Sequence, residues 1–238
     1  MLYLASMSTT ITQMTKVNIM TKHNIQRVNM VKGQIEPNDV YNEEVLNVFE
    51  KVPRENFVPS ALKDVAYIDE DVEIVPGRYM LEPTTQARIV QAAITGESDY
   101  ALTIGSGYGY MAAILSHFCT TVIAVEESPE VAKTASEVLA AQEYVNVVVM
   151  NAPMAQGCPK EAPYNIILFE GAVGSVPPEV IKQLADNGRL FAVERPDPYK
   201  QGHAVCYLRQ GSHISKQVLF DANAPYLPGF EPATKFVF

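Results

Sequence analysis

The chain has 238 residues, enough for one α/β core and short for two. Hydrophobic residues make up 47% and charged residues 19%, a globular rather than a disordered balance, and no apolar stretch is long enough to span a membrane. Because 27 Asp and Glu oppose 18 Lys and Arg, the formal charge is −9, which disfavours nucleic acid and anionic lipid as partners.

The N-terminus and the cysteines indicate a cytoplasmic location. Five of the nine methionines lie in the first thirty residues, and the apolar run there is too short for a secretory signal. We interpret residues 1–20 as a weakly ordered extension. The three cysteines have wide, unpatterned spacing, so we predict reduced thiols, no disulfide framework and no metal site.

The first third of the chain predicts a helical N-terminal cap over residues 21–82. Apolar residues recur at helical spacing over 22–35 and 41–50. Residues 63–80 show no sustained period and predict a long loop. Pro83 suits the first turn of a further helix that runs to about Ile94.

From residue 83 to 238 the pattern predicts an α/β domain. Short apolar runs predict strands at 100–104, 121–125, 145–150, 164–169 and 189–194, and helices are predicted at 108–117, at 129–142 and from Pro177-Pro178. This alternation implies right-handed crossovers and a mostly parallel sheet. Two last strands, 204–209 and 214–220, have no helix between them and imply an antiparallel edge.

A glycine-rich turn and an acidic residue form the main chemical motif. Gly105-Ser106-Gly107-Tyr108-Gly109 follows a predicted strand and opens a predicted helix, where glycines allow a ligand to approach the backbone closely. Tyr110 replaces the glycine that a dinucleotide fingerprint needs, so a pyrophosphate cradle is disfavoured. Glu126 ends the next strand and can accept hydrogen bonds from both ribose hydroxyls of an adenosine ligand. The alternative is a solvated carboxylate at a strand end, since Glu127 lies beside it.

Several further segments carry a family resemblance over about residues 27–209. They are Met30-Val31-Lys32-Gly33-Gln34-Ile35, Val52-Pro53-Arg54-Glu55-Asn56-Phe57-Val58-Pro59, Ala66-Tyr67, Ile104–Tyr110, Ala162-Pro163-Tyr164-Asn165 and Gln183–Leu190. With these segments the chain resembles the protein-L-isoaspartate O-methyltransferase family of class I S-adenosylmethionine-dependent methyltransferases. The resemblance implies a Rossmann-like sandwich and S-adenosylmethionine as cofactor. It also implies a monomer that methylates isoaspartyl residues of damaged proteins or peptides.

The resemblance also implies a set of site residues. The cofactor-binding candidates are Gly105, Ser106, Gly107, Tyr108, Gly109, Glu126, Glu127, Asn151 and Ala152. The catalytic candidates, in the loop that aligns with the active-site loop of the family, are Arg78, Leu81 and Glu82.

This sequence departs from the family pattern at several polar positions. Leu81 stands at the position of a serine, Thr103 and Asn165 at positions of acids, and Asn151-Ala152 at the position of a Gly-Asp pair. Asn151, Glu127 or Asn165 are candidates to compensate for the lost cofactor contacts. An acceptor carboxylate is already ionised at pH 7, so the lost serine weakens positioning rather than removing a base.

The charged residues of this loop act in opposite ways on an anionic acceptor. A carboxylate at Glu82 would repel it, and Arg78 could offset this by a bidentate contact. A solvated ion pair between Arg78 and Glu82 is the alternative.

Three hypotheses follow: an isoaspartyl methyltransferase, a methyltransferase with another acceptor, and a binding or regulatory protein without catalysis.

Overall fold

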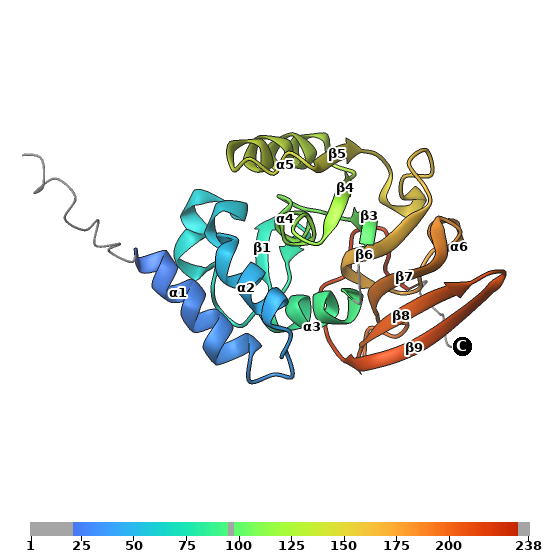
Figure 1. Cartoon of the computed structure of the whole chain (residues 1–238), viewed down its shortest axis with the longest axis horizontal. Helices are drawn as coiled ribbons and strands as arrows, with labels where there is room; N and C mark the ends of the chain where they lie inside the picture. Colours follow the sequence, from blue (N-terminus) through green and yellow to red (C-terminus); the bar gives the residue numbers. More distant parts are fainter. Residues whose placement is uncertain (1–20, 95–97, 233–238) are drawn as a thin grey trace, which may run out of the picture.

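The computed structural model describes residues 21–94 and 98–232 and centres on a seven-stranded sheet (Figure 1). The strand order is β5-β4-β3-β6-β7-β8-β9. The strands are β3 (Ser98–Ile104), β4 (Cys119–Glu126), β5 (Val147–Asn151), β6 (Tyr164–Val173), β7 (Leu184–Glu194), β8 (His203–Gln210) and β9 (His213–Asp221). Neighbours from β5 to β7 are parallel, and β8 and β9 are antiparallel. The predicted mostly parallel sheet with an antiparallel edge is confirmed.

Side chains alternate along the strands into two buried clusters, one on each face of the sheet. On β3, Ala101 belongs to one cluster, while Leu102 and Ile104 belong to the other. This two-sided burial is typical of parallel strands covered on both faces. The covering helices are α3 (Pro83–Ala93), α4 (Tyr110–Leu115), α5 (Pro129–Ala141), α6 (Pro178–Ile181) and the 3₁₀ turn η4 (Met154–Gln156).

The predicted helix start at Pro83 is confirmed, and α5 shows why the sequence begins a helix where it does. Ser128 precedes α5, and its hydroxyl accepts a hydrogen bond from the Val131 backbone N–H. Pro129 occupies the first turn, where its missing N–H costs nothing. No helix within 21–94 and 98–232 is long and apolar enough to cross a membrane.

The segment before α3 contains short helices and one hairpin. The helical elements are α1 (Lys22–Met30), the π-helical turn η1 (Val31–Ile35), α2 (Glu43–Lys51) and the 3₁₀ turns η2 (Arg54–Phe57) and η3 (Ser60–Val65). The expectation of a long loop over 63–80 is wrong, because β1 (Val72–Val75) and β2 (Arg78–Met80) pair there in antiparallel fashion. Two strands this short give no sustained hydrophobic period. The predicted extension, residues 1–20, lies outside the described residues.

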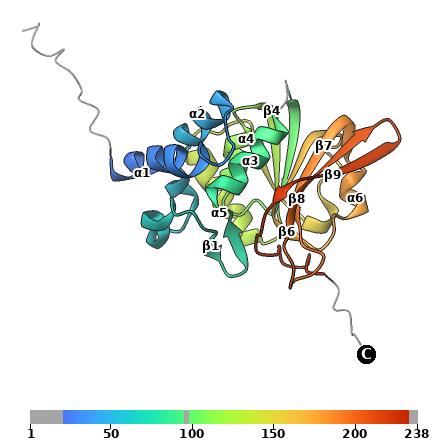
Figure 2. The ribbon, with the colours of Figure 1, turned by 90° about the horizontal axis from the view of Figure 1, so that it is seen from below.

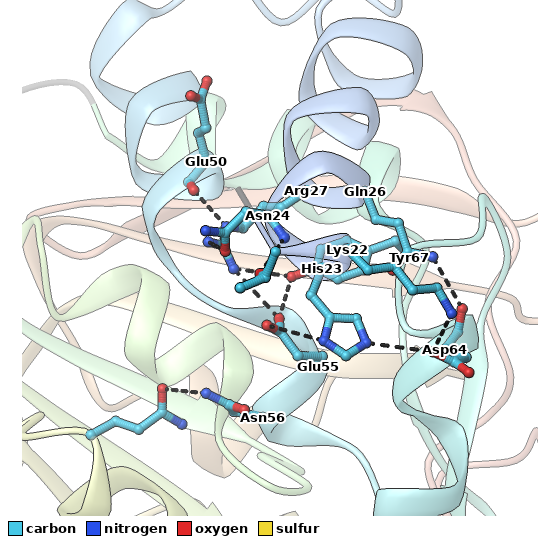
Figure 3. Close-up of polar contacts among 12 residues, drawn as sticks. Lys22, His23, Asn24, Gln26, Arg27, Glu50, Glu55, Asn56, Asp64 and Tyr67 are labelled. Atoms are coloured by element: carbon cyan, nitrogen blue, oxygen red, sulfur yellow. Dashed lines mark hydrogen bonds and ion pairs between the residues drawn. The ribbon is translucent and has the colours of Figure 1, made fainter. Parts of the chain in front are cut away.

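A polar network closes the outer side of this segment (Figure 3). Arg27 Nη1 donates to Tyr67 Oη at 3.2 Å and lies 3.5 Å from Glu55 Oε2. Tyr67 Oη in turn donates to the Glu55 carboxylate, and Arg27 Nε donates to the Glu50 carbonyl at 2.7 Å. These contacts fix α1 against α2, η2 and the chain just after η3.

Arg54 joins the helical segment to the sheet domain. Its fully buried guanidinium donates to the carbonyls of Ala66 (2.6 Å) and Leu81 (2.5 Å) and to Gln86 Oε1 (2.5 Å). It also lies 4.9 Å from the centre of the Tyr110 ring. Each guanidinium nitrogen therefore has a partner on a different segment.

We expect Arg54→Met to lower the free energy of unfolding by about 3 kcal/mol or more, because it leaves buried acceptors without donors. Urea denaturation of the full chain measures this change. Arg88→Met is the matched control, since the half-buried Arg88 guanidinium stacks on Phe220 at 3.8 Å. Its loss should cost about 1 kcal/mol or less. Equal losses for the two variants would contradict the role given to Arg54.

Candidate functional site

A cavity of about 570 Å³ opens at the carboxyl edge of the parallel strands. In open parallel sheets ligands bind at this edge, beside the point where the strand order reverses. Here the order reverses between β3 and β6. The lining residues are Val75, Pro76, Arg78, Tyr108, Glu126, Glu127, Ser128, Glu130, Val131, Thr134, Met154 and Pro228.

The glycine turn connects β3 to α4 beside this cavity. Gly105 and Gly107 have φ values of +80° and +53°, a region that residues with a Cβ atom rarely adopt. The N–H groups of Gly105 and Ser106 donate to the carbonyl of Val125 at 2.9 and 3.2 Å. Gly109 then precedes the first residue of α4. The motif therefore brings the backbone after β3 close to the end of β4.

Glu126 is the last residue of β4 and its side chain is only 1% exposed. Its Oε2 accepts hydrogen bonds from Gly107 N (3.0 Å) and Arg78 Nη2 (2.7 Å). Its Oε1 accepts from Glu127 N (3.0 Å) and Ser128 N (3.3 Å). A carboxylate has about four acceptor positions. Donors of the chain itself therefore use all of the acceptor capacity of Glu126.

Arg78 comes from strand β2 and reaches across to the edge of the main sheet. Its side chain is 7% exposed and lines the cavity. Nη2 donates to Glu126, but Nε and Nη1 have no hydrogen-bond partner within the described part of the chain. Arg78 thus has donors left over at the site, while its partner carboxylate has no free acceptor.

Three more buried side chains near Arg78 have polar atoms without a partner among the described residues. They are Thr103 Oγ1, Ser106 Oγ and Glu170 Oε1. Burial raises the pKa of Glu170 to about 8, although the positive charge of Arg78 and the nearby Thr103 hydroxyl act in the opposite direction. Its carboxyl group is therefore mainly protonated at pH 7. Several unpartnered buried polar groups in one place are typical of a site that binds a polar ligand.

Some of the remaining cofactor candidates line the cavity, and others hold the backbone at the end of β4. Tyr108 and Glu127 line the cavity, and the Glu127 side chain accepts from Met154 N at 3.4 Å. Asn151 Nδ2 donates to the carbonyls of Glu126 (3.0 Å) and Glu127 (2.8 Å). Ala152 N donates to the Glu126 carbonyl at 3.2 Å. Asn151 and Ala152 therefore hold the backbone that carries the two acids.

Of the three catalytic candidates, only Arg78 lines the cavity. Leu81 is buried, and its carbonyl accepts from Arg54. Glu82 precedes α3 and its carboxylate accepts a hydrogen bond from the Thr85 hydroxyl. The ion pair that Arg78 makes in the structure is with Glu126 and not with Glu82.

The sequence interpretation missed Glu170, Met154 and Leu227. Glu170 follows directly on the predicted strand 164–169, because β6 continues to Val173. An acid at the end of an apolar run is a signal that could have been used. Met154 and Leu227 give no signal in the sequence, since their contacts with the site come from distant segments.

The C-terminal segment Pro225–Phe230 lies over the glycine turn. Leu227 is 1% exposed, and a Cβ atom added to Gly105 would lie 2.7 Å from its Cδ2. A Cβ atom added to Gly171 would lie 2.7 Å from its Cγ. The two glycines, one after β3 and one on β6, thus leave the space that the Leu227 side chain fills.

S-adenosylmethionine, the cofactor that the resemblance implies, fits these residues in part. Its nucleoside half suits the cavity, where Tyr108 and Met154 form apolar walls and Glu126 lies at the edge. Leu227 and Arg78 fill the space above the glycine turn, next to this cavity. No group of three or more His, Cys, Asp or Glu residues that could hold a metal ion occurs in residues 21–94 and 98–232.

The protonated state of Glu170 predicts a pH dependence of stability. In the folded chain the carboxyl keeps its proton up to about pH 8, whereas in the unfolded chain it ionises near its ordinary pKa of 4.5. The unfolded state therefore releases a proton that the folded state retains, and this group lowers stability as pH rises from about 4.5 to about 8. We expect Glu170→Gln to gain stability relative to the wild type across this range in urea denaturation.

Asp71→Asn is the control for this experiment. Burial raises the pKa of Asp71 to about 6, so its contribution should level off near that pH. The difference between wild type and Glu170→Gln should continue to grow up to about pH 8. A constant difference from pH 5 to pH 8 would show that Glu170 is ionised in the folded protein.

Comparison with known proteins identifies the family. The chain matches the Protein-L-isoaspartate(D-aspartate) O-methyltransferase (PCMT) family over residues 25–220. A Protein-L-isoaspartate O-methyltransferase of Methanoculleus marisnigri is 36% identical over 171 residues, which cover 72% of this chain and 78% of the relative. Another, from Synechococcus sp., is 37% identical over 177 residues, which cover 74% of this chain and 72% of the relative.

Solved structures show the same fold at low sequence identity. A protein-L-isoaspartate O-methyltransferase structure aligns with a TM-score of 0.74 and 19% identity, over 88% of this chain and 67% of that one. A beta-aspartate methyltransferase (PCMT) structure from Plasmodium falciparum, in complex with S-adenosyl-L-homocysteine, aligns with a TM-score of 0.69 and 19% identity, over 84% of this chain and 97% of that one. The chain therefore belongs to the protein-L-isoaspartate(D-aspartate) O-methyltransferase family, a family of S-adenosylmethionine-dependent methyltransferases.

Proposed function

We propose that this chain transfers a methyl group from S-adenosylmethionine to the free carboxylate of isoaspartyl residues in proteins and peptides. The observation that carries this proposal is the buried Glu126 at the end of β4, beside the glycine turn and the cavity. Relatives named Protein-L-isoaspartate O-methyltransferase cover more than two thirds of the chain and support the same acceptor.

The residues around the cavity are suited to an anionic acceptor. S-adenosylmethionine, when bound, supplies an activated methyl group, and a carboxylate acceptor needs no strong base at pH 7. Arg78 has two guanidinium nitrogens without partners in residues 21–94 and 98–232 and can hold a carboxylate by charge-assisted hydrogen bonds. Glu170 is mainly protonated at pH 7 and so adds little repulsion. The Glu82 carboxylate is engaged by Thr85 and does not line the cavity.

Different residues around the cavity are proposed to have different roles in binding. Glu126 is proposed to bind the ribose hydroxyls once Arg78 turns from this carboxylate to the ligand, with Tyr108, Glu127 and Met154 around the base. Asn151 and Ala152 are proposed to position the two acids through backbone hydrogen bonds. Positioning and exclusion of water are the main requirements of an in-line methyl transfer.

The proposal includes the surroundings in which the chain works. We propose that the protein is a monomer in the cytoplasm, that it acts on damaged proteins, and that it does not bind nucleic acid or membrane. The formal charge of −9 supports the exclusion of anionic polymers and anionic lipid surfaces as partners.

A second acceptor class is favoured by one observation. Leu81 occupies the position at which the family carries a serine, and here it is buried with its carbonyl on Arg54. No hydroxyl at this position can orient an isoaspartyl carboxylate. A methyltransferase with a different acceptor is therefore the second candidate function.

Methyl transfer from labelled S-adenosylmethionine tests the first candidate. We expect the wild type to label an isoaspartyl peptide and not the same peptide with a normal aspartate. Glu126→Gln should lower kcat/KM by about 10- to 100-fold, because it replaces a charged acceptor of the ribose hydroxyls. Glu137→Gln, on the exposed side of α5, is the matched control and should leave kcat/KM unchanged.

The labelling assay and a measurement of S-adenosyl-L-homocysteine binding together separate the three hypotheses. Labelling of the wild type that is lost in Glu126→Gln supports the isoaspartyl activity. Binding of S-adenosyl-L-homocysteine without labelling of the isoaspartyl peptide would contradict that acceptor and favour another one. Absence of S-adenosyl-L-homocysteine binding would leave only the non-catalytic binding protein.

A further inference from the structure

We infer that Arg78 couples the binding of the two substrates: it competes with the ribose of the cofactor for one oxygen of Glu126, and once displaced it holds the carboxylate of the methyl acceptor. Binding of the cofactor therefore prepares the site for the acceptor, and Arg78 selects an acceptor that is anionic. This inference rests on the proposed function, because it concerns the same site and the same two ligands.

The first argument is that, among the described residues, Arg78 is the only side chain that donates to Glu126. The other three donors are the backbone N–H groups of Gly107, Glu127 and Ser128, at 3.0, 3.0 and 3.3 Å. Backbone hydrogen bonds of the glycine turn and of the start of α5 hold these groups in place. A ribose hydroxyl that donates to Glu126 must therefore replace Arg78 Nη2, which lies 2.7 Å from Oε2.

The second argument is the incomplete hydrogen bonding of Arg78. Its side chain is only 7% exposed, and Nε and Nη1 have no partner in the part of the chain that the structure describes. Loss of the contact with Glu126 would leave a buried guanidinium without any partner, which costs free energy. A carboxylate can accept two parallel hydrogen bonds from such a guanidinium. Arg78 therefore binds an anion more tightly after the ribose has displaced it than before.

The third argument is the place of Arg78 at the mouth of the cavity. Arg78 is the first residue of β2, and it lines the cavity together with Val75 and Pro76 of the hairpin and Pro228 of the C-terminal segment. Figure 2 shows the hairpin and this segment at the same end of the sheet. A rotation of the arginine side chain moves the guanidinium within the cavity and leaves the pairing of Val75 with Arg78 intact.

The fourth argument is the state of the other acids near the cavity. Glu127 and Glu130 line it but are exposed, and an ion pair at an exposed position contributes little. Glu170 is buried close to Arg78, and burial raises its pKa to about 8, so it is mainly protonated at pH 7. The carboxylate of the acceptor is thus the anion that gains most from the displaced guanidinium.

Calorimetric titration of the full chain with two nucleosides tests the competition for Glu126. The probes are adenosine and 2′,3′-dideoxyadenosine, which lacks both ribose hydroxyls. We expect Arg78→Met to raise the affinity for adenosine about fivefold, because the hydroxyls no longer displace a charged donor, and the affinity for 2′,3′-dideoxyadenosine by less than about twofold. The ratio of the two affinities is decisive, because a general change of the cavity would alter both together. An unchanged or lower ratio would overturn the inference.

Two further variants serve as controls for the nucleoside titration. Arg88→Met removes a half-buried arginine that stacks on Phe220 at 3.8 Å and does not line the cavity, so it should leave the affinity ratio unchanged. Arg78→Lys keeps a charged donor for Glu126 and should keep the ratio within about twofold of the wild type. A ratio that rises equally in Arg78→Lys and Arg78→Met would contradict the competition.

The coupling itself is measured on the wild type, so it does not depend on the folding of a variant. The readout is the affinity for an isoaspartyl peptide. We expect saturating adenosine or S-adenosyl-L-homocysteine to raise this affinity about tenfold, and the peptide to raise the affinity for either probe by the same factor, since coupling between two sites is reciprocal. The same peptide with a carboxamide in place of the isoaspartyl carboxylate should show no coupling.

The two probes also identify the anion that Arg78 binds, because S-adenosyl-L-homocysteine carries a carboxylate of its own and adenosine does not. Coupling of the peptide to both probes supports the inference. Coupling to adenosine alone would show that Arg78 holds the carboxylate of the cofactor, and would overturn it. Peptide binding that is independent of both probes would contradict the coupling and leave the proposed function intact. If S-adenosyl-L-homocysteine or the peptide binds under no condition, the proposed function fails and the inference fails with it.

Discussion

The ion pair between Arg78 and Glu126 connects the helical segment to the functional edge of the sheet. It joins a short hairpin to the end of β4 over 2.7 Å, with both side chains almost completely buried. Burial of two charges costs free energy that is recovered only when further hydrogen bonds satisfy both groups. Glu126 meets this condition through three backbone N–H groups, whereas Arg78 keeps two nitrogens without partners in the described chain. The arginine is thus the member of the pair that gains from a polar ligand.

The two buried arginines, Arg54 and Arg78, differ in role: Arg54 stabilises the fold, and Arg78 has donors available at the cavity. Arg54 directs each guanidinium nitrogen to an acceptor on a different segment, and it fixes Leu81 and the start of α3. Arg78 has one ion pair and spare donors at the wall of a cavity. A fully satisfied cation stabilises one arrangement, while a partly satisfied one can change partners.

The sequence predicts the sheet and the glycine turn because these depend on local pattern. Apolar runs of five or six residues, separated by helical periods, give the five parallel strands, and the turn at Gly105 and the acid at Glu126 follow from their positions at strand ends. The β1–β2 hairpin is too short for a period. The place of Arg78 opposite Glu126 depends on that hairpin, 48 residues away in the chain, so no local pattern indicates it.

Contacts across the fold also explain why the raised pKa of Glu170 and the position of Leu227 could not be predicted from sequence. Glu170 looks like a strand-end acid, but burial, together with the negative charge of Glu126, raises its pKa to about 8. Leu227 lies in a proline-containing segment after the last strand, and its fit depends on Gly105, which follows β3, and on Gly171, which lies on β6.

The charges at the site bear on which ligand it can hold. Glu126 forms an ion pair with Arg78, burial raises the pKa of Glu170 to about 8, and Thr103 stands where the family carries an acid. Arg78 therefore stands beside an apolar side chain, that of Leu227, and close to a carboxyl group whose pKa burial raises to about 8. Its Nε and Nη1 have no partner among the described residues. A polar or anionic ligand that reaches these donors meets little opposing negative charge besides Glu126.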